Sequence, residues 1–416
     1  MMGKDKRKHV AGLSCGLPFS CPLFPYTAML GMSDASHENS RPILFVPLGE
    51  EETRLYGLHP RDRLFRIAEK AGLAPGHRQG LTEEGARGTI LADIGYAWDP
   101  AWLTHLVDHP GSVLVIEGRP VLAHCISDAQ RAVMLAAMEE GASMDGHGMT
   151  AIDPATTELS YHQLRKRDKP FIMALNAANK MEVERALYDA SYKGVTDVLT
   201  LYLWRKPAFH LTRWAAAAGM SPNMITAIGA AFCVAAFFLF WYGMYWQGVA
   251  AGFVFMVLDT VDGKLARCTG TSSWWGNIFD HGIDLVHPPF WWWAWAEGLK
   301  VYAAGNLRFE PVYEAAILVA IVGGYIVQRV IEGVFMRRYG MHIHVWREVD
   351  SRFRLITARR NPNMVILVGS LLFARPDVGL ELVALWTLVS LIFHAVRLAQ
   401  AEGARMRGEP VTSWLA

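Results

Sequence analysis

The second half of the chain consists of long apolar runs separated by short polar segments. Crossing the hydrocarbon core of a membrane, which is about 30 Å thick, takes about 20 mostly apolar residues in a helix. Six runs approach or reach this length: Met224–Tyr242, Gly248–Arg267, Trp274–Trp295, Val312–Phe335, Asn361–Ala374 and Val378–Leu398. They predict a bundle of six transmembrane helices. Ser221-Pro222-Asn223 before the first run is typical of a helix start, where Ser caps free amides and Pro is tolerated.

Basic side chains predict how this bundle is oriented, because Lys and Arg collect on the cytoplasmic side of membrane proteins. The turn between the first two runs, residues 243–247, contains neither. Arginines gather instead after the fourth run and after the sixth: Arg337, Arg338, Arg347, Arg352, Arg354, Arg359 and Arg360, then Arg397, Arg405 and Arg407. This asymmetry predicts an integral protein of the inner or plasma membrane with both termini in the cytoplasm. Two termini on the same side require an even number of crossings, so six helices fit this arrangement and five would not.

The first half of the chain has the pattern of a compact α/β unit. Ile43–Val46 and Ser112–Ile116 are short β-rich runs, and Arg61–Gly72 has its apolar residues at helical spacing, with Gly72 as the stop. We therefore expect an all-α six-helix transmembrane bundle preceded by a small cytoplasmic α/β domain.

Five regions follow from these patterns: an N-terminal extension at 1–40, the α/β domain at 41–150, a linker at 151–220, the transmembrane domain at 221–400 and a cytoplasmic tail at 401–416. In the linker, Val195–Ala217 mixes apolar and basic residues, so we expect it to lie in the membrane interface. The alternative is an amphipathic helix packed on the preceding domain. The extension faintly resembles a secretory signal but has no clean cleavage site, and we interpret it as dispensable, with an alternative start at Met32.

Composition supports a membrane protein and narrows the partners. Hydrophobic residues make up 52 % of the 416 and charged residues 19 %, which is more apolar than a typical soluble protein. The net charge of +1 gives no indication of a nucleic-acid partner. The five cysteines show no CxxC or other metal-ligand spacing, which favours a reducing compartment.

Four carboxylates enter the second and third apolar runs together, although charged groups are costly inside a membrane. Asp259 and Asp262 are three positions apart, and Asp280 and Asp284 are four apart, so each pair projects from one face of its helix. Four clustered acids repel one another unless cations compensate them. Divalent ions with oxygen ligands are the natural compensation, and two Mg²⁺ ions, or Mn²⁺ in their place, suit displacement at phosphorus.

Small residues beside these acids leave room for a ligand. Gly263, Ala266 and Gly276 would let it approach the helix backbones, and Arg267 offers paired donors to a diphosphate. His281 and His287 lie nearby, but we interpret them as hydrogen-bonding neighbours rather than as zinc ligands.

The same residues carry a family resemblance. The run Asp259-Thr-Val-Asp262-Gly263-Lys-Leu-Ala266-Arg267, then eight residues, then Gly276-Asn-Ile-Phe-Asp280-His-Gly-Ile-Asp284 resembles the signature of the CDP-alcohol phosphotransferases at every fixed position. The signature covers Asp259–Asp284, and Ser221–Thr226 is similar to the family's entry into its first membrane helix.

The resemblance implies a membrane enzyme that transfers a substituted phosphate from a CDP-linked alcohol to an acceptor hydroxyl and releases CMP, within a six-helix bundle that often forms homodimers. It implies metal binding by Asp259, Asp262, Asp280 and Asp284, with Asp284 also acting as the base that takes the acceptor's proton. It places Gly263, Ala266, Arg267 and Gly276 at the CDP moiety. The residues alone do not distinguish which of the four acids is the base.

The acceptor is expected to be anionic. Arginines gather at the expected cytoplasmic mouth, and an Arg inside a membrane helix must reach the interface or find an anion. Arg329, Arg359 and Arg360 are the candidates for binding the acceptor's phosphate. The competing explanation is that positive-inside bias alone accounts for them.

The α/β region is similar in part to sugar-phosphate nucleotidyltransferases, as found in bifunctional enzymes that make a CDP-polyol and then use it. It departs from them after the first strand, where Leu48-Gly49-Glu50-Glu51-Glu52-Thr53-Arg54 replaces a Gly-rich phosphate loop. Three glutamates would repel a triphosphate, so we expect a degenerate, structural or regulatory domain. The alternatives are a bifunctional enzyme that makes its own CDP-polyol and an intramembrane cation transporter, although we find no internal repeat of the kind that transporters show.

Overall fold

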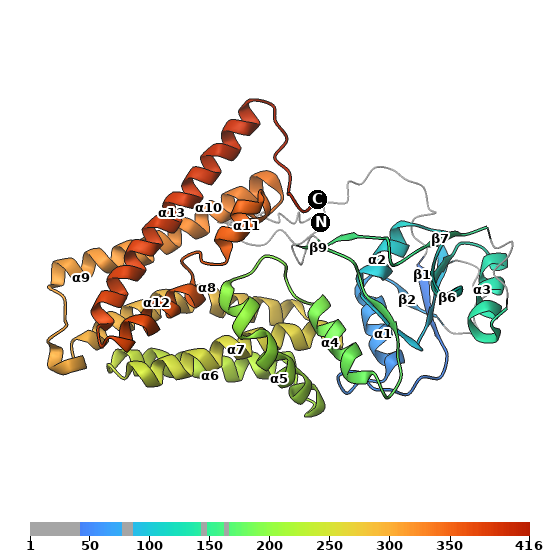
Figure 1. The fold of residues 1–416 in the computed structure, drawn as a ribbon, viewed down its shortest axis with the longest axis horizontal. Helices are drawn as coiled ribbons and strands as arrows, with labels where there is room; N and C mark the ends of the chain where they lie inside the picture. Colours follow the sequence, from blue (N-terminus) through green and yellow to red (C-terminus); the bar gives the residue numbers. More distant parts are fainter. Residues whose placement is uncertain (1–41, 77–85, 143–147, 162–165) are drawn as a thin grey trace, which may run out of the picture. The chain divides into compact units, whose positions relative to one another are not determined.

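The computed structural model describes residues 42–76, 86–142, 148–161 and 166–416 (Figure 1). The predicted N-terminal extension, including Met32, lies outside the described residues. The described chain has a mixed α/β region followed by a helical region (Figure 1). Three cysteines in the described part, Cys125, Cys233 and Cys268, are buried and free.

The α/β region is built on a six-stranded mixed sheet. Its strands, in spatial order, are β2 (Ala74–Pro75), β1 (Ile43–Leu48), β3 (Gly88–Asp93), β6 (Arg119–Cys125), β5 (Ser112–Ile116) and β7 (Thr150–Ile152). β1 pairs in parallel with β2 and β3, and β5 with β7, whereas β6 runs antiparallel to both of its neighbours. The sheet confirms the predicted α/β domain, and β7 carries it past residue 150.

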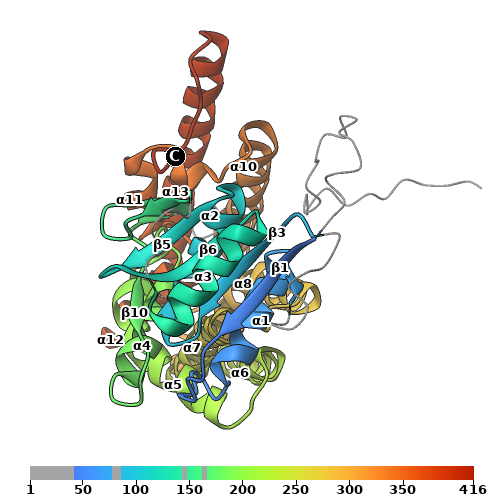
Figure 2. The same cartoon turned by 90° about the vertical axis from the view of Figure 1, so that its right-hand side faces the viewer.

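Both faces of this sheet are covered, which explains the continuous apolar run of β1. α1 (Pro60–Lys70) and α2 (Ala101–Asp108) pack on one face through Leu64 and Trp102. α3 (Asp128–Glu140) packs on the other face through Met134 (Figure 2). Two small sheets complete the region: β4 (Tyr96–Trp98) with β10 (Ile172–Ala174), and β8 (Leu159–Tyr161) with β9 (Lys166–Asp168).

The linker contains α4 (Lys180–Ala190), a π-helical turn (Leu199–Leu203) and α5 (Arg205–Ala217). Basic groups of α5 form ion pairs with acids of α4, at 2.5 Å for Arg213 with Glu184 and 2.9 Å for Arg205 with Asp189. Trp214 of α5 is 64 % exposed. These ion pairs join α5 to another part of the linker, and neither contact of α5 with the membrane interface nor its packing on the preceding domain is decided by them.

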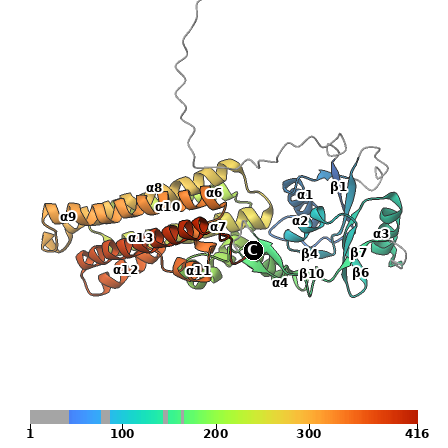
Figure 3. The same cartoon turned by 90° about the horizontal axis from the view of Figure 1, so that it is seen from above.

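Helices occupy all six predicted apolar segments (Figure 3). They are α6 (Pro222–Trp241), α7 (Tyr245–Thr269), α8 (Trp274–Leu299), α9 (Pro311–Leu318) continued by a π-helical turn (Val319–Gly323) into α10 (Gly324–Tyr339), α12 (Arg360–Leu372) and α13 (Pro376–Met406). Shorter elements are 3-10 turns at Tyr302–Gly305 and Ile343–Val345 and helix α11 (Glu348–Arg354).

Three of the described helices are long and apolar enough to cross a membrane: Pro222–Trp241, Pro311–Tyr339 and Pro376–Met406. α7 and α8 are long but carry the charged signature residues, and α12 has 13 residues. A membrane protein is therefore supported, and the count of six crossings stays a prediction.

The helical region has an aromatic core in which backbones approach closely. Trp291 and Trp295 of α8 are at most 1 % exposed and lie against Phe240 of α6. A Cβ on Gly298 would lie 2.1 Å from the backbone oxygen of Phe240, so this position has no space for a side chain. These contacts pack the C-terminal half of α8 closely against the end of α6.

Candidate functional site

The signature acids lie on two helices joined by a tight turn. α7 ends at Thr269, and Gly270 follows in the left-handed conformation at φ 68°, which glycine adopts without strain. Ser273 then caps α8, because its Oγ accepts a hydrogen bond from the amide of Gly276 at 3.1 Å. This local sequence turns the chain back, so that acids from the end of α7 face acids from the start of α8.

Three of the four predicted acids come together. One carboxylate oxygen each of Asp259, Asp280 and Asp284 lies within 4.8 Å of the other two. Arg360, at the start of α12, donates from Nη2 to Asp259 at 2.8 Å and from Nη1 to Asp284 at 2.6 Å. The guanidinium thus partly neutralises this carboxylate group.

The fourth acid, Asp262, is outside this three-acid group and is more buried than its members. Its side chain accepts a hydrogen bond from the Thr226 hydroxyl of α6 at 2.6 Å, and the residue is 3 % exposed. Asp262 lines one narrow gap between side chains together with Asp259 and Asp280, and the other lining residues are Thr226, Gly229, Phe255 and Ile283. Asp259 and Asp280 thus belong both to this gap and to the group with Asp284.

The predicted CDP-binding residues flank these acids. The Arg267 guanidinium covers Gly263, where a Cβ would lie 3.2 Å from Nη2. Arg267 Nε is buried without a hydrogen-bond partner. Gly276 faces Asn223, whose side-chain oxygen would be 2.7 Å from a Cβ at that position, and Ala266 is 9 % exposed.

The three candidate acceptor arginines separate into two groups. Arg360 contacts the signature acids, whereas Arg329 and Arg359 both donate to Glu332 of α10, at 2.7 and 2.6 Å. His344 Nε2 lies 3.3 Å from the same carboxylate. Arg329 and Arg359 therefore have an internal anion as their partner.

The two histidines near the signature differ in their contacts. His281 Nδ1 lies 3.5 Å from a carboxylate oxygen of Asp280 and 3.0 Å from the Asn277 carbonyl. His287 is bonded through Nδ1 to the Ile283 carbonyl at 2.7 Å, and its ring packs against Trp291. That the two histidines are hydrogen-bonding neighbours rather than zinc ligands stays a prediction.

Several supporting residues were missed in the sequence. Asn361 accepts a hydrogen bond from Arg360 Nε at 3.1 Å and donates to Asp197 at 2.9 Å, so the linker helps to hold the arginine. Glu332 and His394 were also missed, although the sequence could have singled them out as candidate functional residues. Each is an ionisable residue inside an apolar run.

The donor set around the acids suits a hard divalent cation. All four candidate ligands offer carboxylate oxygens, which Mg²⁺ and Mn²⁺ prefer, and the group has no sulfur or imidazole ligand. Arg360 uses oxygens of Asp259 and Asp284 that a cation would also use. The guanidinium and a metal ion would therefore compete for these oxygens.

Comparison with known proteins agrees with the signature. Residues 219–393 match the family model described as CDP-alcohol phosphatidyltransferase. An uncharacterised class-I protein of that family from Schizosaccharomyces pombe is 36 % identical over 83 residues, 17 % of this chain and 22 % of the relative. Cholinephosphotransferase 1 from Mus musculus is 27 % identical over 184 residues, 36 % of this chain and 45 % of the relative.

A third relative is choline/ethanolaminephosphotransferase 1 from Arabidopsis thaliana, 29 % identical over 132 residues, 25 % of this chain and 33 % of the relative. The chain thus matches less than half of the length of each of these relatives. The family model covers the helical region that contains the acids.

Proposed function

We propose that this chain, in which residues 219–393 form a CDP-alcohol phosphatidyltransferase domain, transfers a substituted phosphate from a CDP-alcohol to an acceptor hydroxyl and releases CMP in phospholipid or polar-headgroup synthesis. The observation that carries the proposal is the convergence of Asp259, Asp280 and Asp284 from α7 and α8. These residues belong to the family signature, and charged groups in apolar helices are rarely without a function.

In this proposal Asp259, Asp262, Asp280 and Asp284 hold two Mg²⁺ ions. When bound, the ions supply positive charge that polarises the phosphate and stabilises the leaving CMP. Asp284 accepts the proton of the acceptor hydroxyl. Its side chain is 44 % exposed, against 17 % for Asp259 and 28 % for Asp280, so a hydroxyl can reach it more readily.

The CDP moiety is proposed to lie along Gly263, Ala266, Arg267 and Gly276. The unpaired Nε of Arg267 supports this placement, because a buried guanidinium N–H without an acceptor is unfavourable and a diphosphate oxygen would satisfy it. The names of the relatives point to choline and ethanolamine as alcohols to test on the donor.

The acceptor is proposed to be anionic and to be bound by Arg329, Arg359 or Arg360. An acceptor phosphate would compete with Glu332 for Arg329 and Arg359, because these two residues already contact that carboxylate. Arg360 would likewise have to release Asp259 or Asp284, but it is the one of the three that contacts the signature acids, so a phosphate bound to it would lie beside them.

We further propose that all six helical segments cross an inner or plasma membrane, with both termini and the acids on the cytoplasmic side, and that the protein forms a homodimer. The three apolar spans and the arginines of residues 337–360 support the placement. Pairing of two copies is an expectation from the family resemblance.

The α/β domain is proposed to be structural or regulatory rather than a working nucleotidyltransferase. In the loop after β1, Glu51 accepts a hydrogen bond from the Thr53 amide at 2.8 Å and Glu52 lies 3.3 Å from His59. Tyr56, just beyond, donates from its amide to Glu184 of α4 at 3.0 Å. Backbone amides that would cradle phosphates in an active loop are thus engaged with the protein's own acids.

The experiment is a substrate panel with purified full-length protein and Mg²⁺. CDP-choline, CDP-ethanolamine, CDP-diacylglycerol and soluble CDP-polyols are each combined with neutral and phosphorylated acceptors, and products are identified by mass spectrometry beside CMP release. We expect one donor and acceptor pair to give stoichiometric CMP and condensed product. Absence of CMP from every pair would contradict the proposed activity. A separate reaction supplies CTP and polyol phosphates, and formation of a CDP-polyol there would contradict the inactive α/β domain.

A further inference from the structure

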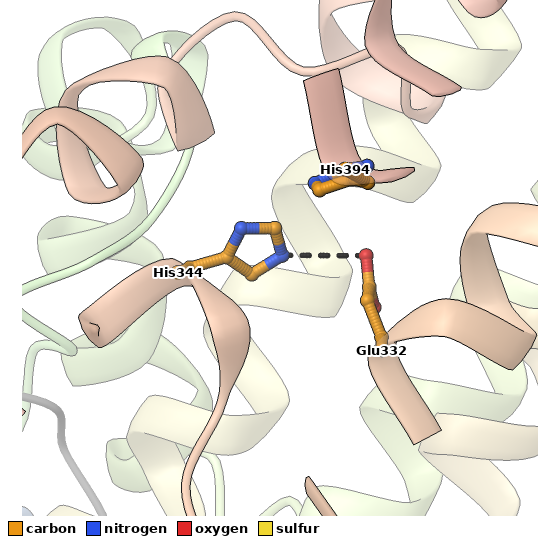
Figure 4. Close-up of side chains that lie close together, drawn as sticks. All are labelled: Glu332, His344 and His394. Atoms are coloured by element: carbon orange, nitrogen blue, oxygen red, sulfur yellow. Dashed lines mark hydrogen bonds and ion pairs between the residues drawn. The ribbon is translucent and has the colours of Figure 1, made fainter. Parts of the chain in front are cut away.

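A second cluster of ligand-type side chains lies outside the signature. Glu332 from α10, His344 from the 3-10 turn at Ile343–Val345, and His394 from α13 meet in the helical region (Figure 4). One ligand atom of each lies within 4.8 Å of the other two. His344 is 3 % exposed and His394 is 0 % exposed, so both imidazoles are shielded from water.

His394 has no partner that explains its position. Neither ring nitrogen has a hydrogen bond, although a neutral imidazole carries one donor and one acceptor. Leaving a buried polar group unsatisfied costs about 1–3 kcal/mol. Its ring lies over the Glu332 carboxylate and 5.2 Å from the His344 ring, so a ligand shared by the three residues would satisfy it (Figure 4).

We propose that Glu332, His344 and His394 form a binding site for a transition-metal cation of the Zn²⁺ class, distinct from the oxygen-only site of the signature acids. Two imidazoles and one carboxylate are a common zinc ligand set, with the fourth position open, whereas Mg²⁺ prefers oxygen ligands. Two ligand atoms about 2.0–2.1 Å from one tetrahedral ion lie about 3.3–3.4 Å apart. His344 Nε2 and Glu332 Oε1 are separated by 3.3 Å.

The ring nitrogen of His344 that faces the cluster is Nε2. It lies 3.3 Å from Glu332 Oε1 and 3.2 Å from Arg359 Nη2. A guanidinium can only donate, so Nε2 would have to give up its contact with Arg359 in order to bind a cation.

Two arginines set the strength of the site. Arg329 donates to Glu332 at 2.7 Å and keeps that carboxylate oriented, as outer partners of metal ligands do. Arg359 donates to the same carboxylate at 2.6 Å. Their positive charge also opposes a dication, and Arg359 lies where it contacts both Glu332 and His344. A metal ion would therefore displace Arg359 from part of its contact, and removal of the Arg359 charge should strengthen binding.

The test uses Co²⁺ as a spectroscopic probe of purified full-length protein in detergent, with Mg²⁺ in excess to saturate the signature acids. We expect one equivalent of Co²⁺ to give the visible absorption of a four-coordinate ion and Zn²⁺ to abolish it. His394→Gln and Glu332→Gln should each weaken binding by about 10–100-fold or more, whereas Arg359→Gln should tighten it. His210→Gln, which changes an exposed histidine of α5, is the matched control and should bind as wild type does.

Absence of a four-coordinate band in wild type would overturn the proposal, and so would an unchanged band in His394→Gln. Thermal melting identifies a variant that is unfolded, and the Arg359→Gln result still decides, because tighter binding cannot come from a misfolded site. Asp284→Asn should keep the band, so failure of the proposed transferase activity leaves this test unaffected.

Discussion

The hydrogen bond between Thr226 and Asp262 gives a measurable link between α6 and the proposed metal site. Thr226→Val keeps the shape of the side chain and removes the hydroxyl that donates to Asp262 at 2.6 Å. The same hydroxyl is 3.1 Å from the Pro222 carbonyl, so its single proton goes to the nearer carboxylate. The bond orients a proposed metal ligand, and loss of such an outer partner costs about 10- to 100-fold in metal affinity. Since 1.4 kcal/mol is about tenfold, this loss corresponds to about 1.4–2.8 kcal/mol.

The assay is CMP release as a function of Mg²⁺ concentration. Thr226→Val should shift half-maximal activation to about 10- to 100-fold more Mg²⁺, while the rate at saturating Mg²⁺ changes little. Thr212→Val is the matched control, because Thr212 is 0 % exposed and its hydroxyl donates to the Ala208 carbonyl at 2.7 Å within α5. If Thr226→Val and Thr212→Val have the same Mg²⁺ dependence as wild type, Asp262 does not bind the activating ion through this arrangement.

Three further predictions concern the acceptor, the topology and the packing of the bundle. Arg360→Lys, which loses bidentate geometry, should raise the acceptor's KM or lower turnover with little change in donor affinity, and wild-type kinetics would exclude an acceptor role. Introduced cysteines at 340–358 should react from the cytoplasmic side and those at 243–247 from the other, and the reverse labelling would show an inverted protein. Gly298→Ala should lower stability by about 1–3 kcal/mol in thermal melting, because its Cβ would overlap backbone. Gly369→Ala in α12 has open space and should be neutral or slightly stabilising; equal melting points for the two variants would contradict this packing.

The helices and the faces that carry the acids were predictable, because the sequence of a single segment determines each of them. Apolar runs of membrane length marked the helices, and the i, i+3 and i, i+4 spacing of the acids showed which faces they share. The left-handed Gly270 and the Ser273 cap then form locally, which is why acids from the two helices meet.

Contacts between distant segments could not be predicted in the same way. Arg360 contacts Asp259 across 101 positions, and Thr226 contacts Asp262 across 36. The spacing of residues along one helix predicts neither pair, because each contact depends on how two helices pack against each other. The pairing of Arg329 and Arg359 with Glu332 was missed for the same reason, and the basic segment had suggested only an external anion.

The central claim is that the four signature acids act together in Mg²⁺-dependent release of CMP. The direct measurement is CMP release at saturating CDP-alcohol and Mg²⁺ by four single variants: Asp259→Asn, Asp262→Asn, Asp280→Asn and Asp284→Asn. Asp108→Asn, at an exposed position of α2, serves as control. Each of the four should lose about 10³-fold or more while remaining folded in the membrane, because residues that act as a unit fail together, and the control should keep wild-type activity. Near-normal rates in any two of the four would contradict the claim.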